Sequence, residues 1–437
     1  MITPREYLFA LEERGIKFGL ANIRYLLDTV DNPQLKYLTV HVAGTNGKGS
    51  VVAFVSSVLR KAGFKVGRYT SPHLIDFSER IVVDEVPISD SELDTLIRQF
   101  IPVAERMAQI EGLERPTYFE FGTAIAFQHF SEKRVDFAVV ETGLGGRLDS
   151  TNVLQPEVIA ITSIDMDHAQ YLGDSIPQIA FEKAGIIKQG VLVVTAARDP
   201  EAIEVIGTKC RETGSRLFVH GVDFNHTIEP AEFPFQKMDF TSSFGSLDGL
   251  AVPLAGAYQG ENAAVSAMMC QILSKPFPQI TEQTIRDGFA ATRWPCRLEL
   301  VRKEPPTIID GGHNPAAALR VRDELKSLFP GKQIVLILAV SGDKDAEGIV
   351  SALAPATSKI IATRYALPRS MSAENLCEIA RRFSDNCVLE PNLGRALARA
   401  DAEAAENTVI LIAGSLYLAG EALKLLSAGN GSNAQQS

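Results

Sequence analysis

The sequence predicts an α/β protein with an N-terminal domain of the phosphate-loop (P-loop) type, built on a mostly parallel sheet, and a smaller C-terminal Rossmann-like α/β domain. Three observations lead to this prediction. Short apolar strands alternate with helical stretches along most of the chain, a pattern typical of parallel sheets covered on both faces. A glycine-rich loop, residues 44–50, separates the first strand from a helix. The 437 residues also exceed the usual size of a single core.

A strand, a glycine loop and a helix open the first domain. Residues 37–43 are rich in β-branched and aromatic side chains and stop at glycine, so we expect a buried strand. Apolar residues at helical spacing over 51–62, followed by Gly63, predict a helix with a glycine cap. The same criteria predict strands at 137–140, 158–161 and 191–195, and helices around 119–127, over 176–187 and over 263–273. Residues 224–254, dominated by aromatic residues, Thr and Ser, predict a β-rich excursion.

A second α/β series predicts the smaller domain. Proline interrupts regular structure at Arg293-Trp294-Pro295-Cys296-Arg297, so we place the domain boundary there. This divides the chain into residues 1–294, residues 295–427 and a tail, 428–437, whose low apolar content predicts disorder. Strands are expected after the boundary at 307–309, 333–338, 359–363 and 408–412.

Composition and charge exclude several classes of protein. Hydrophobic residues make up 46% of the chain and charged residues 22%, which argues against a disordered or fibrous protein. A net charge of −10 disfavours nucleic acids and anionic membranes as partners, because they usually need a basic surface. The sequence has no apolar run of membrane-helix length, no signal-peptide pattern and no C-x-x-C pair among its five cysteines. We therefore expect a cytoplasmic enzyme with reduced thiols.

The loop Gly44-Thr45-Asn46-Gly47-Lys48-Gly49-Ser50 carries the strongest functional signal. It differs from the common Gly-x4-Gly-Lys-Ser/Thr phosphate loop by an extra glycine before the hydroxyl residue. Gly47 and Gly49 let backbone N–H groups approach phosphates. Lys48 supplies positive charge, and Ser50 is suited to bind Mg²⁺ at the helix N-terminus. The alternative is an ordinary glycine turn, but the flanking strand and helix favour an ATP site.

Glu141 and His168 lie just beyond predicted strands, where open α/β sheets bind ligands. Glu141 is therefore a candidate for the acidic and metal cluster that carboxylate activation needs near the γ-phosphate, with a helix-capping or surface Glu as the alternative. His168 is a candidate metal ligand by the same placement, although a single His is more often structural. Lys183 is, by residue type alone, a solvated helix lysine.

Motifs in sequence order resemble folylpolyglutamate synthase and dihydrofolate synthase of the Mur ligase superfamily. The resemblance runs from about residue 18 to residue 421, and the glycine loop alone would indicate only the superfamily. Besides that loop, the motifs are Thr70-Ser71-Pro72-His73-Leu74, Glu141-Thr142-Gly143-Leu144-Gly145-Gly146-Arg147-Leu148-Asp149-Ser150-Thr151-Asn152, Glu182-Lys183-Ala184-Gly185-Ile186, Asp310-Gly311-Gly312-His313-Asn314-Pro315 and Gly414-Ser415-Leu416-Tyr417-Leu418-Ala419-Gly420-Glu421.

This resemblance implies metal ligands that the residue types alone do not establish. In this family Mg²⁺, with two sites expected, is held by residues that match Ser50, Ser71, Glu141 and His168. The lysine that matches Lys183 is typically carbamylated, which turns a cation into a metal-binding carboxylate. The candidate catalytic residues are therefore Lys48, Lys183, His168 and Glu141.

The nucleotide site implied by the resemblance draws on both domains. Its candidate residues are Gly47, Lys48, Gly49, Ser50, Asn262, Arg297, Asp310 and, nearby, His313. Because Arg297, Asp310 and His313 lie beyond the predicted boundary, ATP would lie between the domains. Closure of the domains would then exclude water from an acyl phosphate.

A pterin site is implied as well. Aromatic rings suit a flat heterocycle, and a carboxylate suits the amino-pyrimidine donors of a pterin. For Phe119 and Phe121 the alternative is plain core packing. The candidate residues are Phe18, Gly19, Leu20, Thr117, Tyr118, Phe119, Glu120, Leu148, Asp149 and Ser150.

Four positions depart from the pattern of the family. Tyr258 stands where a histidine is usual, Cys296 replaces a glycine, Gly312 replaces an alanine, and Ser50 stands where many relatives have threonine. Cys296 restricts the backbone beside Arg297, and Tyr258 changes the expected surroundings of the adenine. No departure removes a candidate metal ligand.

The implied reaction transfers the γ-phosphate of ATP to a pterin-linked carboxylate, and the amine of L-glutamate then displaces phosphate. Dihydropteroate as acceptor gives dihydrofolate, and tetrahydrofolate as acceptor gives folylpolyglutamates. The sequence leaves open whether the protein has one of these activities or both. The alternatives are a Mur-type peptide ligase and a non-catalytic nucleotide-binding scaffold, against which the retained metal-site residues argue. We expect a monomer without nucleic-acid or membrane partners, and dependence on a monovalent cation stays open.

Overall fold

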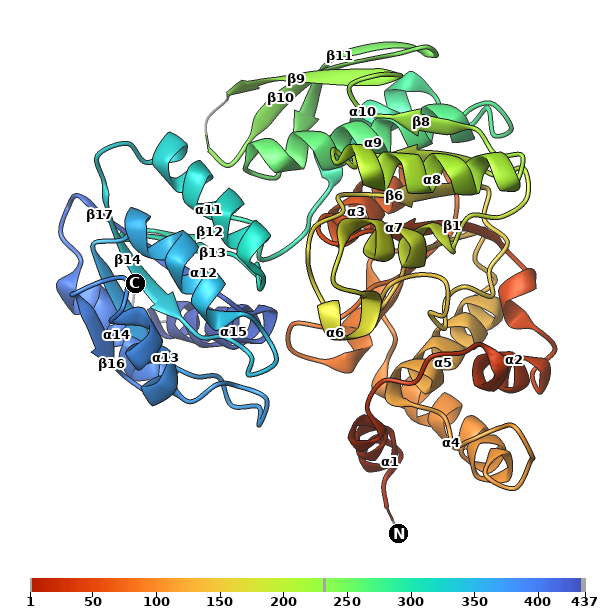
Figure 1. Ribbon diagram of the computed structural model, residues 1–437, viewed down its shortest axis with the longest axis horizontal. Coiled ribbons are helices and arrows are strands. Elements are labelled where there is room, and N and C mark those ends of the chain that lie inside the picture. Colours follow the sequence, from red (N-terminus) through yellow and green to blue (C-terminus); the bar gives the residue numbers. More distant parts are fainter. Residues whose placement is uncertain (1, 231–232, 434–437) are drawn as a thin grey trace.

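The structure, a computed structural model, describes residues 2–230 and 233–433. It has two lobes, each built on its own mostly parallel sheet (Figure 1). All strands of the larger sheet precede residue 292 and all strands of the smaller sheet follow residue 298, so the chain passes between the sheets once, through residues 292–298. The predicted α/β class with a large first and a smaller second unit is confirmed.

The larger sheet has eight strands in the order β4-β3-β2-β5-β1-β6-β7-β8. Neighbours from β2 to β8 are parallel, and β3 and β4 add an antiparallel edge. The strands are β1 (Leu38–Ala43), β2 (Val66–Tyr69), β3 (Ile81–Val83), β4 (Val86–Pro87), β5 (Phe137–Glu141), β6 (Val158–Ile161), β7 (Leu192–Thr195) and β8 (Leu217–Val219). Strand β1 lies between β5 and β6 inside the sheet, so the loop that follows it begins near the middle of the row of carboxyl strand ends.

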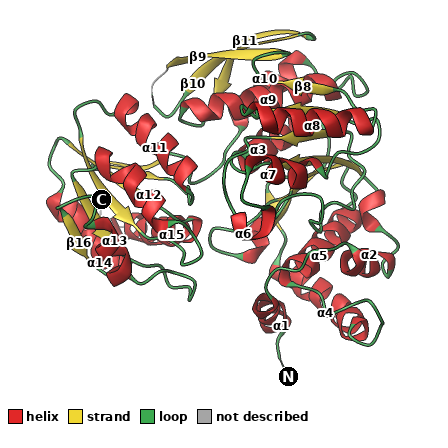
Figure 2. Ribbon diagram, in the orientation of Figure 1, coloured by secondary structure: helices red, strands yellow, loops and turns green. Residues whose placement is uncertain are grey.

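Helices cover both faces of this sheet (Figure 2). The α-helices of this lobe are α1 (Pro4–Ala10), α2 (Ala21–Asp28), α3 (Lys48–Lys61), α4 (Asp90–Met107), α5 (Tyr118–Lys133), α6 (Ala169–Leu172), α7 (Ile176–Ala184), α8 (Pro200–Glu212), α9 (Ala257–Leu273) and α10 (Glu282–Ala291). Short 3-10 helices are η1 (Leu11–Arg14), η2 (Pro33–Leu35) and η3 (Phe77–Arg80).

Alternation along strand β5 divides its side chains between two cores. Phe137 and Val139 pack with residues of α3, α9 and α10 on one face. Ala138 and Val140 pack with residues of α4 and α5 on the other face. This follows from the two-residue period of a strand, and it explains why the sequence shows a continuous apolar run.

The β-rich excursion is confirmed as an antiparallel ribbon of three strands that lies over α9 and α10 (Figure 1). Its strands are β9 (Phe224–Pro230), β10 (Gln236–Ser242) and β11 (Gly245–Val252). Met238 and Phe240 of β10 are fully buried in the same core as helix α9.

The smaller sheet has the order β12-β13-β17-β14-β15-β16 and is parallel except for β12. Its strands are β12 (Glu299–Lys303), β13 (Pro306–Ile309), β14 (Gln333–Leu338), β15 (Lys359–Ala362), β16 (Cys387–Leu389) and β17 (Thr408–Ala413). The helices of this lobe are α11 (Pro315–Leu328), α12 (Ala346–Leu353), η4 (Ala354–Ala356), α13 (Ala373–Ala380), α14 (Leu393–Glu403) and α15 (Leu416–Asn433).

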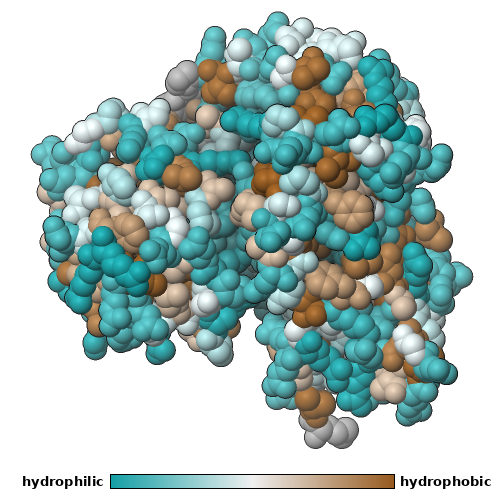
Figure 3. Space-filling view, viewed as in Figure 1, coloured by the Kyte–Doolittle hydropathy of each residue, from teal (hydrophilic) through white to brown (hydrophobic). Residues whose placement is uncertain are grey.

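Hydrophilic residues dominate the face shown in Figure 3, and a hollow separates the two lobes in its lower middle. Among the residues that the structure describes, no helix is both long and apolar enough to cross a membrane.

The predicted strands are all present, but several helices differ in extent from their predictions. Helix α9 begins at Ala257 rather than at residue 263. Helix α7 ends at Ala184 rather than at residue 187, because Gly185 packs against Arg147 and the chain turns there. Helix α15 runs from Leu416 to Asn433, and the expected disorder of the tail 428–437 stays a prediction. Residues 434–437 lie outside the described residues, and the boundary at 294/295 stays a prediction.

His41 gives the stability of the larger lobe a dependence on pH. The side chain is fully buried in β1, where Nε2 lies 2.8 Å from Oγ1 of Thr151, and burial lowers its pKa to about 3. An unfolded histidine takes up a proton below about pH 6.5, whereas folded His41 does not, so stability is lost as pH falls from about 6.5 to about 3. We expect His41→Asn, which cannot titrate, to lose about 2 kcal/mol less than the parent between pH 7.5 and pH 5 in urea unfolding.

Because the other histidines are present in both proteins, the comparison isolates His41. Equal losses of stability on acidification in the parent and in His41→Asn would contradict this assignment.

Candidate active site

The phosphate loop, residues 44–50, joins strand β1 to helix α3 and packs directly on the end of strand β6. Gly44 and Gly47 have φ angles of 146° and 91°, which residues with side chains rarely adopt. A Cβ atom on Gly44 would lie 1.7 Å from Oγ1 of Thr162, so no larger residue has room. Helix α3 begins at Lys48, and its first backbone N–H groups therefore belong to the loop, an arrangement suited to phosphate.

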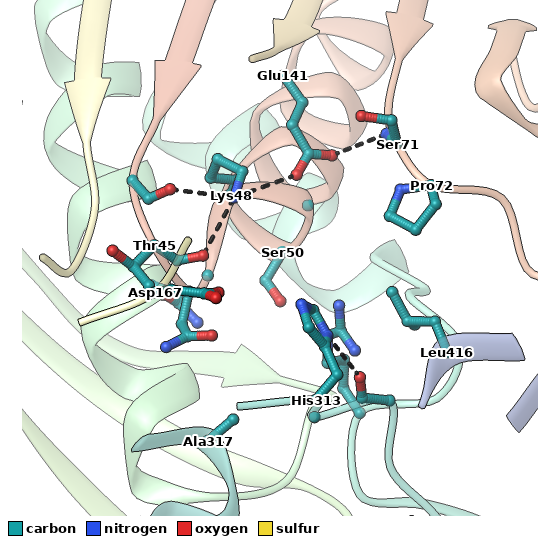
Figure 4. Close-up of a pocket in the computed structure, with 18 of the residues that line it drawn as sticks. Thr45, Lys48, Ser50, Ser71, Pro72, Glu141, Asp167, His313, Ala317 and Leu416 are labelled. Atoms are coloured by element: carbon teal, nitrogen blue, oxygen red, sulfur yellow. Dashed lines mark hydrogen bonds and ion pairs between the residues drawn. The ribbon is translucent and has the colours of Figure 1, made fainter. Parts of the chain in front are cut away.

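Lys48 and Ser50 lie within the cavity above this loop (Figure 4). Nζ of Lys48 donates to the carbonyl oxygens of Gly44 at 3.0 Å and Thr45 at 3.1 Å, and it lies 3.8 Å from Oε1 of Glu141. The Ser50 hydroxyl is buried and has no hydrogen-bond partner among the described residues. An unpaired buried hydroxyl costs about 1–3 kcal/mol, so Ser50 is suited to a ligand that supplies the missing interaction.

Glu141 ends strand β5 and faces the same cavity. Its Oε2 accepts a hydrogen bond from the backbone N–H of Ser71 at 3.2 Å. Burial raises the pKa of this carboxyl group, and the charge of Lys48 opposes the shift. The pair Glu141 and Ser71, from neighbouring strands β5 and β2, therefore supplies oxygen atoms at one side of the phosphate loop (Figure 4).

Lys183 reaches the loop from helix α7, and it is not the solvated lysine that residue type suggests. The side chain is buried, and Nζ donates to the carbonyl oxygen of Gly44 at 2.9 Å. Burial, with a further contribution from the charge of Lys48, lowers the pKa of Lys183 to about 7. A large fraction of Lys183 is therefore a neutral amine near neutral pH.

His168 follows strand β6 and adopts a left-handed backbone with φ of 53°. Burial lowers the pKa of its imidazole to about 4, although the neighbouring Asp167 opposes the shift. Nε2 of His168 lies 3.1 Å from Nζ of Lys344, which comes from the smaller lobe. His168 is thus neutral at physiological pH and accepts a hydrogen bond from a residue of the other lobe.

The smaller lobe contributes Arg297, Asp310 and His313 to the cavity. Asp310 follows strand β13 and is buried; Oδ1 accepts from Gly312 N–H at 2.7 Å, and Oδ2 accepts from Leu298 N–H at 3.0 Å. Burial raises the pKa of Asp310, and the charge of Arg297 opposes the shift. The carboxylate is therefore fixed in place by the backbone before any ligand binds.

All of the residues expected to bind ATP or metal line this one cavity. They come from both lobes. They are Gly47, Lys48, Gly49, Ser50, Ser71, Glu141, His168, Lys183, Asn262, Arg297, Asp310 and His313.

The ten candidate pterin residues do not line this cavity, and several have structural partners. Glu120 accepts hydrogen bonds from Thr117 N–H at 2.7 Å and from Asn22 Nδ2 at 3.3 Å, so it caps helix α5. Asp149 accepts from the N–H groups of Thr151 at 3.0 Å and Leu144 at 2.8 Å. The remaining candidates are Phe18, Gly19, Leu20, Tyr118, Phe119, Leu148 and Ser150, of which Phe18 is exposed and Tyr118 and Ser150 are buried.

Polar contacts between the lobes were not expected from the sequence. Asn314 Nδ2 donates to Oδ1 of Asn46 at 3.1 Å and to Oδ2 of Asp167 at 3.0 Å. Lys344 Nζ donates to Oδ1 of Asp167 at 3.1 Å, and Nη2 of Arg320 lies 3.3 Å from Oδ2 of Asp165 in the same loop. Of these residues, only the Asn-Pro pair at the start of helix α11 has a recognisable sequence pattern. That pattern indicates a helix cap and not a contact between the lobes.

Two departures from the family pattern have clear structural settings. Tyr258 donates its hydroxyl proton to Oδ2 of Asp310 at 3.4 Å, and it lines the cavity. Cys296 is fully buried and has φ of 57°, so it occupies the left-handed conformation that a glycine adopts without strain. The change from glycine therefore leaves the turn before Arg297 intact.

Comparison with known proteins agrees with this architecture. Residues 92–270 match the Mur ligase middle domain, and residues 296–416 match the Mur ligase glutamate ligase domain. The fold and the cavity between its lobes thus define an ATP-dependent amide ligase of the Mur type. The chain belongs to the folylpolyglutamate synthase and dihydrofolate synthase family of these ligases.

Three relatives support the assignment. The chain is 36% identical to the dihydrofolate synthase/folylpolyglutamate synthase of Bacillus subtilis, over 97% of this chain and 98% of that protein. The Mycobacterium tuberculosis folylpolyglutamate synthase complexed with ADP and AMPPCP is 33% identical, with a TM-score of 0.89 over 97% of this chain and 99% of that one. Escherichia coli FolC in complex with DHPP and ADP is 28% identical, with a TM-score of 0.86 over 98% of each chain.

The contact of Asn314 with Asp167 predicts a variant that separates the lobes. In Asn314→Asp the side chain still accepts from Ala317 N–H and caps helix α11, but it places a carboxylate against Asp167. We expect the KM for ATP to rise about tenfold, because like charges across a contact disfavour closure. Small-angle X-ray scattering should show a larger radius of gyration.

Asn392→Asp is the matched control, since Asn392 caps helix α14 in the same way and makes no described contact with the larger lobe. An unchanged KM and radius in Asn314→Asp would show that this contact does not hold the lobes together.

Proposed function

We propose that this chain joins L-glutamate to dihydropteroate, to tetrahydrofolate or to both, using Mg-ATP and an acyl phosphate of the pterin-linked carboxylate. The observation that carries the proposal is the cavity lined by all the residues expected to bind ATP and metal. The relatives support the choice of substrates: the E. coli structure contains DHPP and ADP, and the B. subtilis protein is named for both activities.

The residues proposed to hold Mg²⁺, at two sites, are Ser50, Ser71, Glu141, His168 and carbamylated Lys183. The unpaired Oγ of Ser50 and the buried carboxyl group of Glu141 fit this ion, because Mg²⁺ prefers oxygen ligands. Neutral His168 has a lone pair on Nε2 that now accepts from Lys344. The bound ion would neutralise charge on the transferred phosphoryl group.

Lys183 has the properties that carbamylation needs. A carbamate forms when the nitrogen of a neutral amine bonds to the carbon of CO2 and releases a proton. The lowered pKa of about 7 keeps much of Lys183 in that neutral form, and its contact with Gly44 holds the nitrogen beside the phosphate loop. The product replaces a buried cation by an anion that can bind metal.

Lys48 and Arg297 are placed to neutralise the triphosphate from the two lobes. When ATP binds, Nζ of Lys48 exchanges the carbonyl oxygens of Gly44 and Thr45 for phosphate oxygens. Asn262, Asp310 and His313 bind the rest of the nucleotide in this proposal. Because the contributions come from both lobes, closure completes the site.

Two bond exchanges then give the product. An oxygen of the pterin-linked carboxylate bonds to the γ-phosphorus as the bond to ADP breaks. The amine nitrogen of L-glutamate next bonds to the acyl carbon, phosphate leaves, and the amine loses a proton. The chain contributes by positioning the reactants and by excluding water from the acyl phosphate.

For the pterin we propose the residues at the N-terminal end of helix α5, the segment 18–20 and the segment 148–150. The ring of Phe119 connects this region to the cavity, because it packs against the backbone of Gly143, where a Cβ atom would lie 2.4 Å from the ring. Glu120 would have to share its carboxylate between the helix cap and the pterin, since it already accepts two hydrogen bonds.

We further propose that residues 1–294 and 295–427 are the two units that close over ATP, and that the enzyme acts as a monomer in the cytoplasm. The five cysteines support a reducing compartment, because all are buried free thiols.

The direct test uses the full chain with ATP, Mg²⁺, L-glutamate and either dihydropteroate or tetrahydrofolate. We expect glutamate-dependent phosphate release and a product heavier by one glutamyl residue, measured by mass spectrometry. Turnover with one acceptor alone would assign a single activity. Absence of glutamate-dependent turnover with both acceptors would contradict the proposed substrates.

Glu141→Gln tests the metal assignment. We expect turnover to fall about 100-fold to 1,000-fold, because the carboxylate charge beside the transferred phosphoryl group is lost. The thermal midpoint should not fall, since Gln keeps an acceptor for Ser71 N–H and removes a buried charge.

Glu132→Gln, on the surface of helix α5, serves as the control. Full turnover in Glu141→Gln at every Mg²⁺ concentration would remove Glu141 from the metal site without affecting the rest of the proposal.

A further inference from the structure

Trp294, the only tryptophan of the chain, lies directly against the phosphate loop. A Cβ atom on Gly49 would lie 2.6 Å from Cζ2 of Trp294 and 2.9 Å from Cε2. Gly49 belongs to helix α3 and does not have a positive φ. The glycine is therefore needed for space and not for conformation, because a side chain at position 49 would collide with the indole ring.

The indole ring also interacts with the strand that leads to Ser71. The guanidinium carbon of Arg68, in β2, lies 5.3 Å from the centroid of the Trp294 ring, within the range of a cation–π interaction. Arg68 is held by Glu85, whose carboxylate it contacts through two hydrogen bonds of 3.3 Å. Glu85 also pairs with Arg60 of helix α3 at 3.0 Å. Trp294 is thus fixed between helix α3 and strand β2.

Trp294 lies in the segment that carries the chain between the lobes, three residues before Arg297. Arg297 lines the cavity and packs against Gly311. A Cβ atom added to Gly311 would lie 2.7 Å from Nη1 of Arg297. The segment that joins the lobes therefore passes next to the phosphate loop at Trp294.

We propose that Trp294 is a positioning residue for ATP, which fixes the phosphate loop relative to the segment that carries Arg297. Trp294 is not among the residues that line the cavity, and it acts through Gly49 and Arg297. The inference rests on the proposed assignment of residues 44–50 and Arg297 to ATP. It assigns to this side chain a role beyond filling the core on which it packs.

A double-mutant cycle separates positioning from packing. In Gly49→Ala the new methyl group collides with the indole ring, so we expect the affinity for a non-hydrolysable ATP analogue, measured by calorimetry, to fall about tenfold. In Trp294→Ala we expect the affinity for the same analogue to fall, and the KM for ATP to rise by a larger factor than kcat falls. In the double variant the methyl group has space, so the loss of affinity should be about tenfold smaller than the product of the losses in the two single variants.

Gly67→Ala is the matched control. Its Cβ atom would lie 2.7 Å from the ring of Phe130, so it repeats a clash between a glycine and an aromatic ring, but on the opposite face of strand β2 from Arg68. We expect it to lower the thermal midpoint and to leave affinity for the ATP analogue unchanged. Because Trp294 is the only tryptophan, the parent should also show a saturable change in tryptophan fluorescence as the analogue binds.

Strictly multiplicative losses in the cycle, or a Trp294→Ala variant with a lower thermal midpoint and an unchanged KM for ATP, would overturn the inference. These results differ from failure of the proposed function, in which the parent protein itself binds no ATP analogue and has no turnover.

Discussion

The carboxyl ends of the parallel strands in the two sheets face one cavity, and the rest of the site depends on this arrangement. In each sheet these strand ends form one edge, where the connecting loops begin. The edge of the larger sheet supplies the phosphate loop after β1, Ser71 after β2, Glu141 at the end of β5 and His168 after β6. The edge of the smaller sheet supplies Asp310 after β13 and Leu416 after β17. The strand register thus brings together groups that are far apart in the sequence.

Charged side chains at this cavity have backbone hydrogen-bond partners before any ligand binds. Lys48 and Lys183 donate to the same carbonyl oxygen of Gly44, and Glu141 accepts from a backbone N–H group. In the proposed function a nucleotide enters a site whose groups are already oriented, and its phosphates replace contacts that the loop makes with itself. Such preorganisation reduces the rearrangement needed during phosphoryl transfer.

Sequence reasoning located most strands because buried parallel strands are continuous apolar runs, which can be recognised without knowledge of their neighbours. The candidate ATP and metal residues depended on the family resemblance, since a lysine such as Lys183 has no local feature that distinguishes it from a solvated one. Its burial results from α7 packing near Gly44, a contact between segments 139 positions apart. Lys344 was missed for the same reason, because its partners Asp167 and His168 belong to the other lobe.

The single passage of chain between the two sheets has a thermodynamic consequence for closure. Residues 292–298 act as a short tether, and a tether keeps the second lobe at an effective concentration on the order of millimolar relative to the first. A surface that had to capture a free partner would need a large apolar interface. Here polar contacts around Asp165 and Asp167, together with apolar packing of Ala255, Tyr258 and Leu74 against the smaller lobe, hold the tethered lobes together.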